Sequence, residues 1–298
     1  MAWWMLNIAS NILQNITIKL SRYISARVLC FAVMTLFIAG CATVSAGYRS
    51  ADTIASEHHF AKDYVKTDLC NLTSFYHLNN LGAPLTVYIE GDGFAWRTRR
   101  ELSDDPTPRC QLVLSLAAID TSENVAYIAR PGQFGASGSP DCDPVYWSKK
   151  RFSQEAVNAI NTAIDHLKAK SQSKEINIIG YSGGAAIAVI IAAQRNDVAS
   201  LRTIAGNLDS EAVSRYHKVD FLKGSLNPID FATKVSHISQ RHFVSSGDNV
   251  VPMFIAKSFA EKIGDKKYES ITIVEGTSHT TGWQKAWSLL INIPLYRK

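Results

Sequence analysis

Short runs of branched and aromatic apolar residues alternate along this chain with longer segments in which apolar residues recur every three or four positions. The short runs predict buried strands at residues 85–90, 125–129, 176–179, 201–204, around 243 and at 271–276. The longer segments predict helices: residues 152–170 have an apolar stripe that includes Val157, Ile160 and Ile164, and residues 185–193 are small and apolar throughout. This alternation favours an α/β fold with a mostly parallel central sheet and helices on both faces.

Over thirty residues lie between the predicted strand that ends at Ile204 and the one around Phe243. Connections between neighbouring elements are usually shorter, so this segment predicts a small cap inserted into the core. Its larger apolar residues, which either line a pocket or pack the cap itself, are Tyr216, Phe221, Leu222 and Phe231.

A serine between glycines follows one of the buried strands, in the order Gly180, Tyr181, Ser182, Gly183, Gly184. A sharp turn from strand to helix lifts a serine hydroxyl above the edge of a sheet, and such a turn leaves no room for side chains beside the serine. The pattern therefore predicts Ser182 as a nucleophile. A glycine-rich turn with an ordinary serine is the alternative.

Two later loops carry an acid and a base in the chain order that a serine nucleophile on such a sheet requires. Asp248 follows the penultimate strand, and His279 lies in the loop after the last one. We predict that His279 takes the Ser182 proton and that Asp248 orients the imidazole. Asp209, which follows the strand before the cap, is the alternative acid, and either aspartate could instead cap a helix. His242 is a poorer base because it lies within a predicted strand.

The loop after the strand at residues 85–90 reads Gly91, Asp92, Gly93. Acyl transfer needs hydrogen-bond donors for the negative charge that develops on the carbonyl oxygen, and backbone N–H groups are the usual donors. We predict that Gly183 supplies one N–H group of this oxyanion hole and that Asp92 or Gly93 supplies the other. A plain turn after a strand is the alternative.

Four motifs together resemble a known family: Ile-Glu-Gly-Asp-Gly at 89–93, Gly-Tyr-Ser-Gly-Gly at 180–184, Ala-Gly-Asn-Leu-Asp at 205–209 and Gly-Ser-Leu-Asn-Pro at 224–228. From about residue 81 onwards, the chain resembles the α/β-hydrolase superfamily, and within it a group of bacterial envelope hydrolases. The resemblance implies an α/β-hydrolase fold and a serine hydrolase that cleaves an ester or thioester of a small-molecule or lipid-like acyl substrate. Serine peptidases and acyltransferases share the same triad, and a non-catalytic binding scaffold is a further alternative.

The first 40 residues contain no acidic residue, and their apolar run ends in Ile38, Ala39, Gly40 and Cys41. The run is too short for a membrane span of about 20 residues, so it predicts an export signal. The small pair before the cysteine resembles the bacterial lipobox, which implies cleavage before Cys41 and lipid on its thiol and new amino group. Two or more acyl chains would anchor the protein stably to a membrane of the cell envelope, facing the periplasm or the exterior. An uncleaved signal anchor is the alternative.

The relatives that share the four motifs tend to have cysteine where this chain has Gly132, which puts the corresponding disulfide to Cys142 in doubt. If Cys41 carries lipid, three mature cysteines remain, so at most one disulfide forms within the chain. We predict that Cys110 pairs with Cys142 and that Cys70 is left over.

These features divide the chain into a signal peptide at residues 1–40, a tether and lead-in at 41–80, and one catalytic domain at 81–298. The formal net charge of +5 falls to about +2 without the three cations of the signal, so no basic surface indicates nucleic-acid binding. Neither Cys-x-x-Cys nor His-Glu-x-x-His occurs in the chain. We therefore expect no dedicated metal site and no cofactor.

Overall fold

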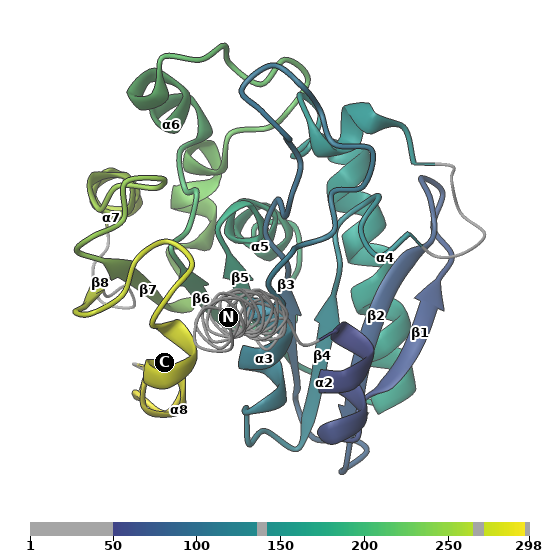
Figure 1. The fold of residues 1–298 in the computed structure, drawn as a ribbon. Helices are drawn as coiled ribbons and strands as arrows, with labels where there is room; N and C mark the ends of the chain where they lie inside the picture. Colours follow the sequence, from purple (N-terminus) through teal and green to yellow (C-terminus); the bar gives the residue numbers. More distant parts are fainter. Residues whose placement is uncertain (1–49, 136–141, 265–270, 296–298) are drawn as a thin grey trace, which may run out of the picture. The chain divides into compact units, whose positions relative to one another are not determined.

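An eight-stranded sheet forms the centre of the structure, a computed structural model that describes residues 50–135, 142–264 and 271–295 (Figure 1). The strand order is β1-β2-β4-β3-β5-β6-β7-β8. The strands are β1 (Ala61–Val65), β2 (Leu72–Leu78), β3 (Leu85–Ile89), β4 (Asn124–Ile128), β5 (Ile176–Tyr181), β6 (Val198–Ile204), β7 (Ser239–Ser245) and β8 (Ile271–Val274). β2 is antiparallel to both of its neighbours, and all pairs from β4 to β8 are parallel.

Helices cover both faces of this sheet (Figure 1). One face is covered by α4 (Gln154–Ser171), α5 (Gly183–Ala192), α7 (Phe254–Ile263) and the 3-10 helix η2 (Pro228–Val235). The other is covered by α2 (Ala51–Glu57), α3 (Leu112–Ala118) and α8 (Trp283–Leu290). Successive strand residues alternate between the two apolar cores, as Val87 and Tyr88 do in β3. The predicted α/β architecture, with a mostly parallel sheet between two helical layers, is confirmed.

The catalytic domain that we predicted to begin at residue 81 in fact begins near residue 50. Helix α2 and strands β1 and β2 all come from the segment that we interpreted as a tether and lead-in, and β2 pairs with β4 inside the sheet. Apolar residues do not alternate regularly with polar ones in this part of the sequence, because β2 buries Thr73 and Ser74 as well as Phe75. The signal peptide and Cys41 lie outside the described residues. Among those that are described, no helix is both long and apolar enough to cross a bilayer.

The predicted cap lies between β6 and β7 and consists of α6 (Ser210–His217), a loop and η2. Leu222 and Phe231 pack against the apolar core on the α5 side. Tyr216 and Phe221 are instead about half exposed, at 47% and 49%. The four apolar residues of this segment therefore divide into two that pack against the core and two that face the surface.

Cys142 forms a disulfide with Cys70, and Cys110 is a free, exposed thiol. The predicted pairing of Cys110 with Cys142 is therefore wrong. Cys70 precedes β2, and the pairing of β2 with β4 brings it into the same apolar core as Cys142. Gly132 has a φ of +82°, and a Cβ atom there would lie 2.6 Å from the Trp147 ring. The local packing thus has no room for a side chain at that position.

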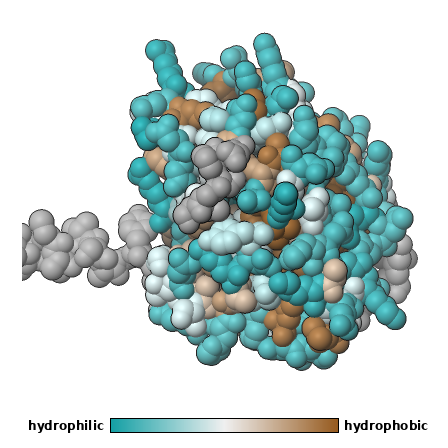
Figure 2. Space-filling model, turned by 90° about the vertical axis from the view of Figure 1, so that its right-hand side faces the viewer, coloured by the Kyte–Doolittle hydropathy of each residue, from teal (hydrophilic) through white to brown (hydrophobic). Residues whose placement is uncertain are grey.

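The side of the molecule that carries β1 and α4 is mainly hydrophilic, with limited apolar areas between polar residues (Figure 2). Helix α4 accounts for part of this surface, because it buries Val157, Ile160, Ile164 and Leu167 and leaves polar residues outside. Its N-terminus is capped by the Ser153 side chain, which accepts from the N–H of Ala156. The helical stripe predicted for residues 152–170 is therefore a core-facing surface.

Candidate active site

Ser182 lies on the sharp turn between β5 and α5, at the carboxyl edge of the parallel sheet. Its φ of 50° is in the left-handed region, which non-glycine residues seldom adopt. The turn requires glycine on both sides: a Cβ atom on Gly180 would lie 2.5 Å from the Cα of Ala185, and one on Gly184 would lie 2.3 Å from the carbonyl oxygen of Ile89. The glycines that flank the serine in sequence thus allow β3, β5 and α5 to approach closely.

A chain of hydrogen bonds connects Ser182, His279 and Asp248. His279 Nε2 is 3.0 Å from Ser182 Oγ, and His279 Nδ1 is 2.7 Å from Asp248 Oδ2. The Asp248 side chain is 1% exposed and that of His279 is 12% exposed, so the acid is shielded from water while the base remains accessible. The structure therefore brings together the three residues that the sequence selected.

Further contacts fix the acid and the base. Asp248 Oδ1 accepts hydrogen bonds from the N–H groups of Val250 and Val251, at 2.8 and 2.9 Å. The carbonyl oxygen of His279 accepts from the Tyr181 hydroxyl at 2.9 Å and from Trp283 Nε1 at 3.1 Å. These two aromatic donors were not predicted from the sequence, because nothing in the residues around Tyr181 or Trp283 indicates a contact with the His279 loop.

The loop Gly91–Asp92–Gly93 lies beside this turn, as the predicted oxyanion hole requires. A Cβ atom on Gly183 would lie 2.1 Å from Asp92 Oδ1, so the Asp92 carboxylate lies directly against the backbone of Gly183. Within the described part of the chain, the N–H groups of Asp92, Gly93 and Gly183 donate no hydrogen bond to another group. All three are therefore available to a ligand oxygen, and the structure does not distinguish between Asp92 and Gly93 as the second donor.

Several solved structures have a similar backbone. An esterase of Pyrococcus furiosus is 12% identical with a TM-score of 0.59, over 79% of this chain and 92% of the esterase. An acylaminoacyl peptidase of Pyrococcus horikoshii is 16% identical with a TM-score of 0.58, over 78% of this chain and 41% of the peptidase. A puromycin-hydrolyzing peptidase of Mycobacterium tuberculosis is 17% identical with a TM-score of 0.57, over 78% of this chain and 38% of that one. The chain has the α/β-hydrolase fold.

At these identities the likeness is one of fold, and this chain spans about two fifths of the length of either peptidase. No protein-family model matches the chain, and no curated protein matches it in sequence. The backbone alone therefore shows the α/β-hydrolase fold, and the chemistry of the site depends on the residues that form it.

Asp209, the alternative acid, occupies a different place in this α/β-hydrolase fold. It is the N-cap of α6, where its Oδ1 accepts from the N–H of Ala212 and from Asn227 Nδ2, each at 3.0 Å. His242 is completely buried in β7, and burial lowers its pKa to about 3, so it stays neutral near pH 7. Its Nδ1 lies 2.9 Å from Thr203 Oγ1. Both residues thus have structural roles, and no group of three His, Cys, Asp or Glu residues in the described ranges is arranged to hold a metal ion.

Glu90 is a buried acid beneath the oxyanion loop that sequence reasoning missed. Its Oε1 accepts from the N–H of Gly91 and its Oε2 from the Tyr127 hydroxyl, each at 2.8 Å. Burial raises the pKa of Glu90 from 4.5 to about 7, against the opposing effects of these hydrogen bonds and of the Arg130 charge. In the sequence Glu90 is simply a polar residue at the end of an apolar strand, which usually marks the point where a strand reaches water.

We expect the Glu90→Gln variant to lose less stability than the wild type between pH 4.5 and 7. Because its pKa is raised in the folded state, Glu90 keeps its proton up to a higher pH in the folded than in the unfolded protein. The wild type therefore loses stability as the pH rises through this window. Between pH 4.5 and 7, the free energy of unfolding of Glu90→Gln should rise relative to that of the wild type by up to about 3 kcal/mol. Urea titrations at several pH values measure it, and parallel pH profiles of the two proteins would contradict the assignment.

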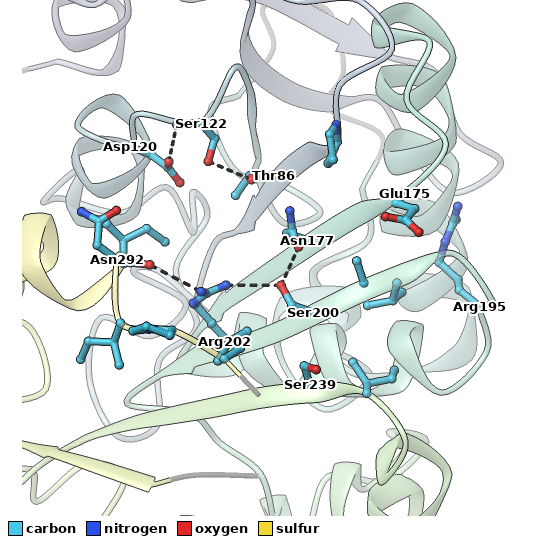
Figure 3. A pocket seen from close by; sticks show the side chains of 18 of the residues that line it. Thr86, Asp120, Ser122, Glu175, Asn177, Arg195, Ser200, Arg202, Ser239 and Asn292 are labelled. Carbon is cyan, nitrogen blue, oxygen red and sulfur yellow. Dashed lines mark hydrogen bonds between the residues drawn. The ribbon is translucent and has the colours of Figure 1, made fainter. Parts of the chain in front are cut away.

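A cavity of about 860 Å³ opens on another part of the molecule (Figure 3). Its lining includes Thr86, Asn177 and Ser200, which lie near the amino ends of β3, β5 and β6. Ser182 follows the carboxyl end of β5, about 16 Å from Asn177 at a strand's rise of about 3.3 Å per residue. The cavity is therefore separate from the Ser182 site, and ligands of α/β sheets generally bind at the carboxyl edge.

Proposed function

We propose that this protein is a serine hydrolase that cleaves a small-molecule or lipid-like ester or thioester through an acyl-enzyme intermediate. The observation that carries the proposal is the hydrogen-bonded chain from Ser182 through His279 to Asp248 on a strained strand-to-helix turn. A serine without a special role would not require a left-handed backbone, a buried acid and a base in line. No cofactor or metal is needed for this chemistry.

In the first half-reaction, Ser182 Oγ attacks the carbonyl carbon of the substrate and gives its proton to His279 Nε2. Asp248 holds the imidazole in the tautomer with hydrogen on Nδ1 and stabilises the imidazolium. The N–H groups of Gly183 and of Asp92 or Gly93 donate to the oxyanion. The bond to the leaving oxygen or sulfur then breaks, and His279 returns the proton to that atom.

In the second half-reaction, water attacks the acyl-enzyme and loses a proton to His279 Nε2. The Ser182 oxygen leaves and recovers that proton, so the enzyme is regenerated and the acid is released. An acyl acceptor other than water would make the same site an acyltransferase.

Labelling with a fluorophosphonate probe tests the proposal, because the probe phosphonylates an activated serine. Mass spectrometry should place the adduct on Ser182, and Ser182→Ala should abolish labelling and most ester turnover while the protein remains folded. Ser278→Ala is the matched control, since Ser278 is next to His279 in sequence but its hydroxyl is bonded to Thr281. An adduct on another serine, or none on folded protein, would contradict the assignment. The absence of any adduct on folded protein would favour a non-catalytic scaffold.

A peptidase is the second candidate, because similar structures include an acylaminoacyl peptidase and a puromycin-hydrolyzing peptidase. The comparison that separates the two is kcat/KM for an ester and an amide with the same acyl group. We expect the ratio of kcat/KM for the ester to that for the amide to exceed the ratio of their uncatalysed hydrolysis rates. A preference for acylated amino-acid amides would replace the esterase assignment by a peptidase.

We further propose that the enzyme is a lipoprotein of the bacterial envelope, held at the membrane by lipid on Cys41. The apolar run that ends in Ile38, Ala39, Gly40 and Cys41 supports this proposal. Cys41→Ser should remove the label introduced by a clickable fatty acid and should shift the protein out of the membrane fraction. Cys110→Ser is the control, since Cys110 is a free and exposed thiol. Equal labelling of wild type and Cys41→Ser would show that Cys41 is not the acceptor.

A further inference from the structure

Two arginines surround the carboxylate of Asp92 in the oxyanion loop. Arg151 Nε is 3.2 Å from Asp92 Oδ2, and Arg130 Nη1 is 3.5 Å from Asp92 Oδ1. The Arg130 side chain is only 4% exposed, and its Nη1 and Nε make no hydrogen bond within the described structure. A guanidinium buried to this degree needs a negative charge nearby; the Asp92 carboxylate supplies it, and Glu90 contributes when it is ionised.

A carboxylate in this position opposes the proposed reaction electrostatically. Asp92 Oδ1 lies next to Gly183, whose N–H is expected to donate to the oxyanion. A fixed negative charge there raises the energy of a second negative charge that develops a few ångströms away. The Asp92 side chain therefore cannot be explained by charge stabilisation of the transition state, and its two cationic partners suggest a mechanical role.

Two buried side chains, those of Gln133 and Glu90, hold the rest of the loop. Gln133 Nε2 donates to the carbonyl oxygen of Gly91 at 3.0 Å, and Gln133 Oε1 accepts from the N–H of Arg130 at 2.9 Å. Glu90 accepts from the N–H of Gly91. Gly91 is thus bonded through both its backbone groups, whereas Asp92 is held only through its side chain.

We propose that Asp92 is a positioning residue: its carboxylate, paired with Arg130 and Arg151, holds the backbone N–H groups of Asp92 and Gly93 toward Ser182. The proposal rests on the hydrolase function proposed above and adds to it the group that orders the oxyanion hole. Arg130 is anchored in turn, because its Nη2 donates to the carbonyl oxygen of Arg151. The ion pairs therefore connect the loop after β3 to the segment that precedes α4.

The sign of the effect of Asp92→Asn separates positioning from simple charge repulsion. If the carboxylate positions the loop, its loss lowers kcat by about 100-fold with little change in KM, since a displacement of about 1 Å at a reacting centre costs that much. If the carboxylate only repels the oxyanion, its loss raises kcat. Asp104→Asn is the matched control, because its ion pair with Arg97 lies on the exposed part of the same loop and should not affect kcat.

Arg151→Lys provides a second variant in case the Asp92→Asn protein does not fold. Lysine keeps the positive charge and loses the planar fork, so kcat should fall in the same direction by a smaller factor. Arg151→Gln combined with Asp92→Asn should be no worse than Asp92→Asn alone, since the two changes break one connection. Strictly multiplicative losses in kcat would overturn the proposal.

Amide hydrogen exchange gives a readout that does not depend on turnover. The Phe94 N–H directly follows the Asp92–Gly93 segment and donates to the carbonyl oxygen of Pro106 at 2.9 Å, so it should exchange slowly in the wild type. It should exchange at least about 10-fold faster in Asp92→Asn, while the amides of β5 and of Gly91, which Glu90 and Gln133 hold, keep their wild-type rates. An unchanged Phe94 rate, or an unchanged or higher kcat, overturns the positioning role. If the wild type neither turns over esters nor reacts with the probe, the proposed function fails, and the exchange rate alone decides the role of Asp92.

Discussion

Asp248→Asn is expected to lower kcat by about 10⁴-fold without unfolding the protein. The asparagine amide would donate to His279 Nδ1, which then becomes an acceptor and leaves the hydrogen on Nε2. An imidazole in that tautomer cannot take the Ser182 proton, although its distance to the serine hydroxyl is preserved. Steady-state kinetics on an activated ester gives kcat, and circular dichroism checks that the fold is intact.

Asp209→Asn is the control for this experiment, because the two aspartates were competing candidates for the same role. Asparagine is as good an N-cap as aspartate, so α6 should keep its cap and kcat should remain near the wild-type value. A larger loss of kcat in Asp209→Asn than in Asp248→Asn would reverse the assignment of the acid.

Cys142→Ser is expected to lower the free energy of unfolding by about 4 kcal/mol. The bond between Cys70 and Cys142 closes a loop across a sequence separation of 72, and restricting an unfolded chain over that length contributes roughly this much in the loop-entropy description. Denaturant titration of the oxidised proteins measures the loss, and removal of either bonded cysteine should give a similar value.

Cys110→Ser distinguishes the observed disulfide from the one that we predicted from the sequence. Cys110 is a free and exposed thiol, so its replacement should change the free energy of unfolding by less than about 0.5 kcal/mol. A loss comparable to that of Cys142→Ser would restore the pairing of Cys110 with Cys142.

The parts of the fold that could be predicted from sequence are those whose causes are local. Ser182, Asp248 and His279 each follow a short apolar strand, and the carboxyl ends of parallel strands lie at one edge of a sheet. The disulfide could not be found in this way, because Cys70 and Cys142 are 72 residues apart and lie side by side through the pairing of β2 with β4. β2 itself was missed because it buries polar residues, such as Thr73 and Ser74, among apolar ones.

The groups behind the oxyanion loop were missed for a related reason. In the sequence Glu90 looks like an ordinary acid at the end of a strand and Asp92 like an ordinary loop acid, and only the fold reveals that the first is buried and that the second faces two guanidinium groups. Their roles depend on Arg130, Gln133 and Arg151, which are about 40 to 60 residues away in the chain. Sequence spacing carries no information on such contacts.

Every residue of α5 is buried, whereas the loops that carry Asp248 and His279 include exposed positions. The backbone of Ser182 is tied to this core, since its N–H donates to Ile204 and its carbonyl accepts from Asn207. The three functional groups therefore belong to regions that open at different denaturant concentrations. Mild denaturant should separate the acid and the base from a nucleophile turn that is still folded. We expect the resulting inactive form to be native-like, and its activity to return on dilution without refolding of the core.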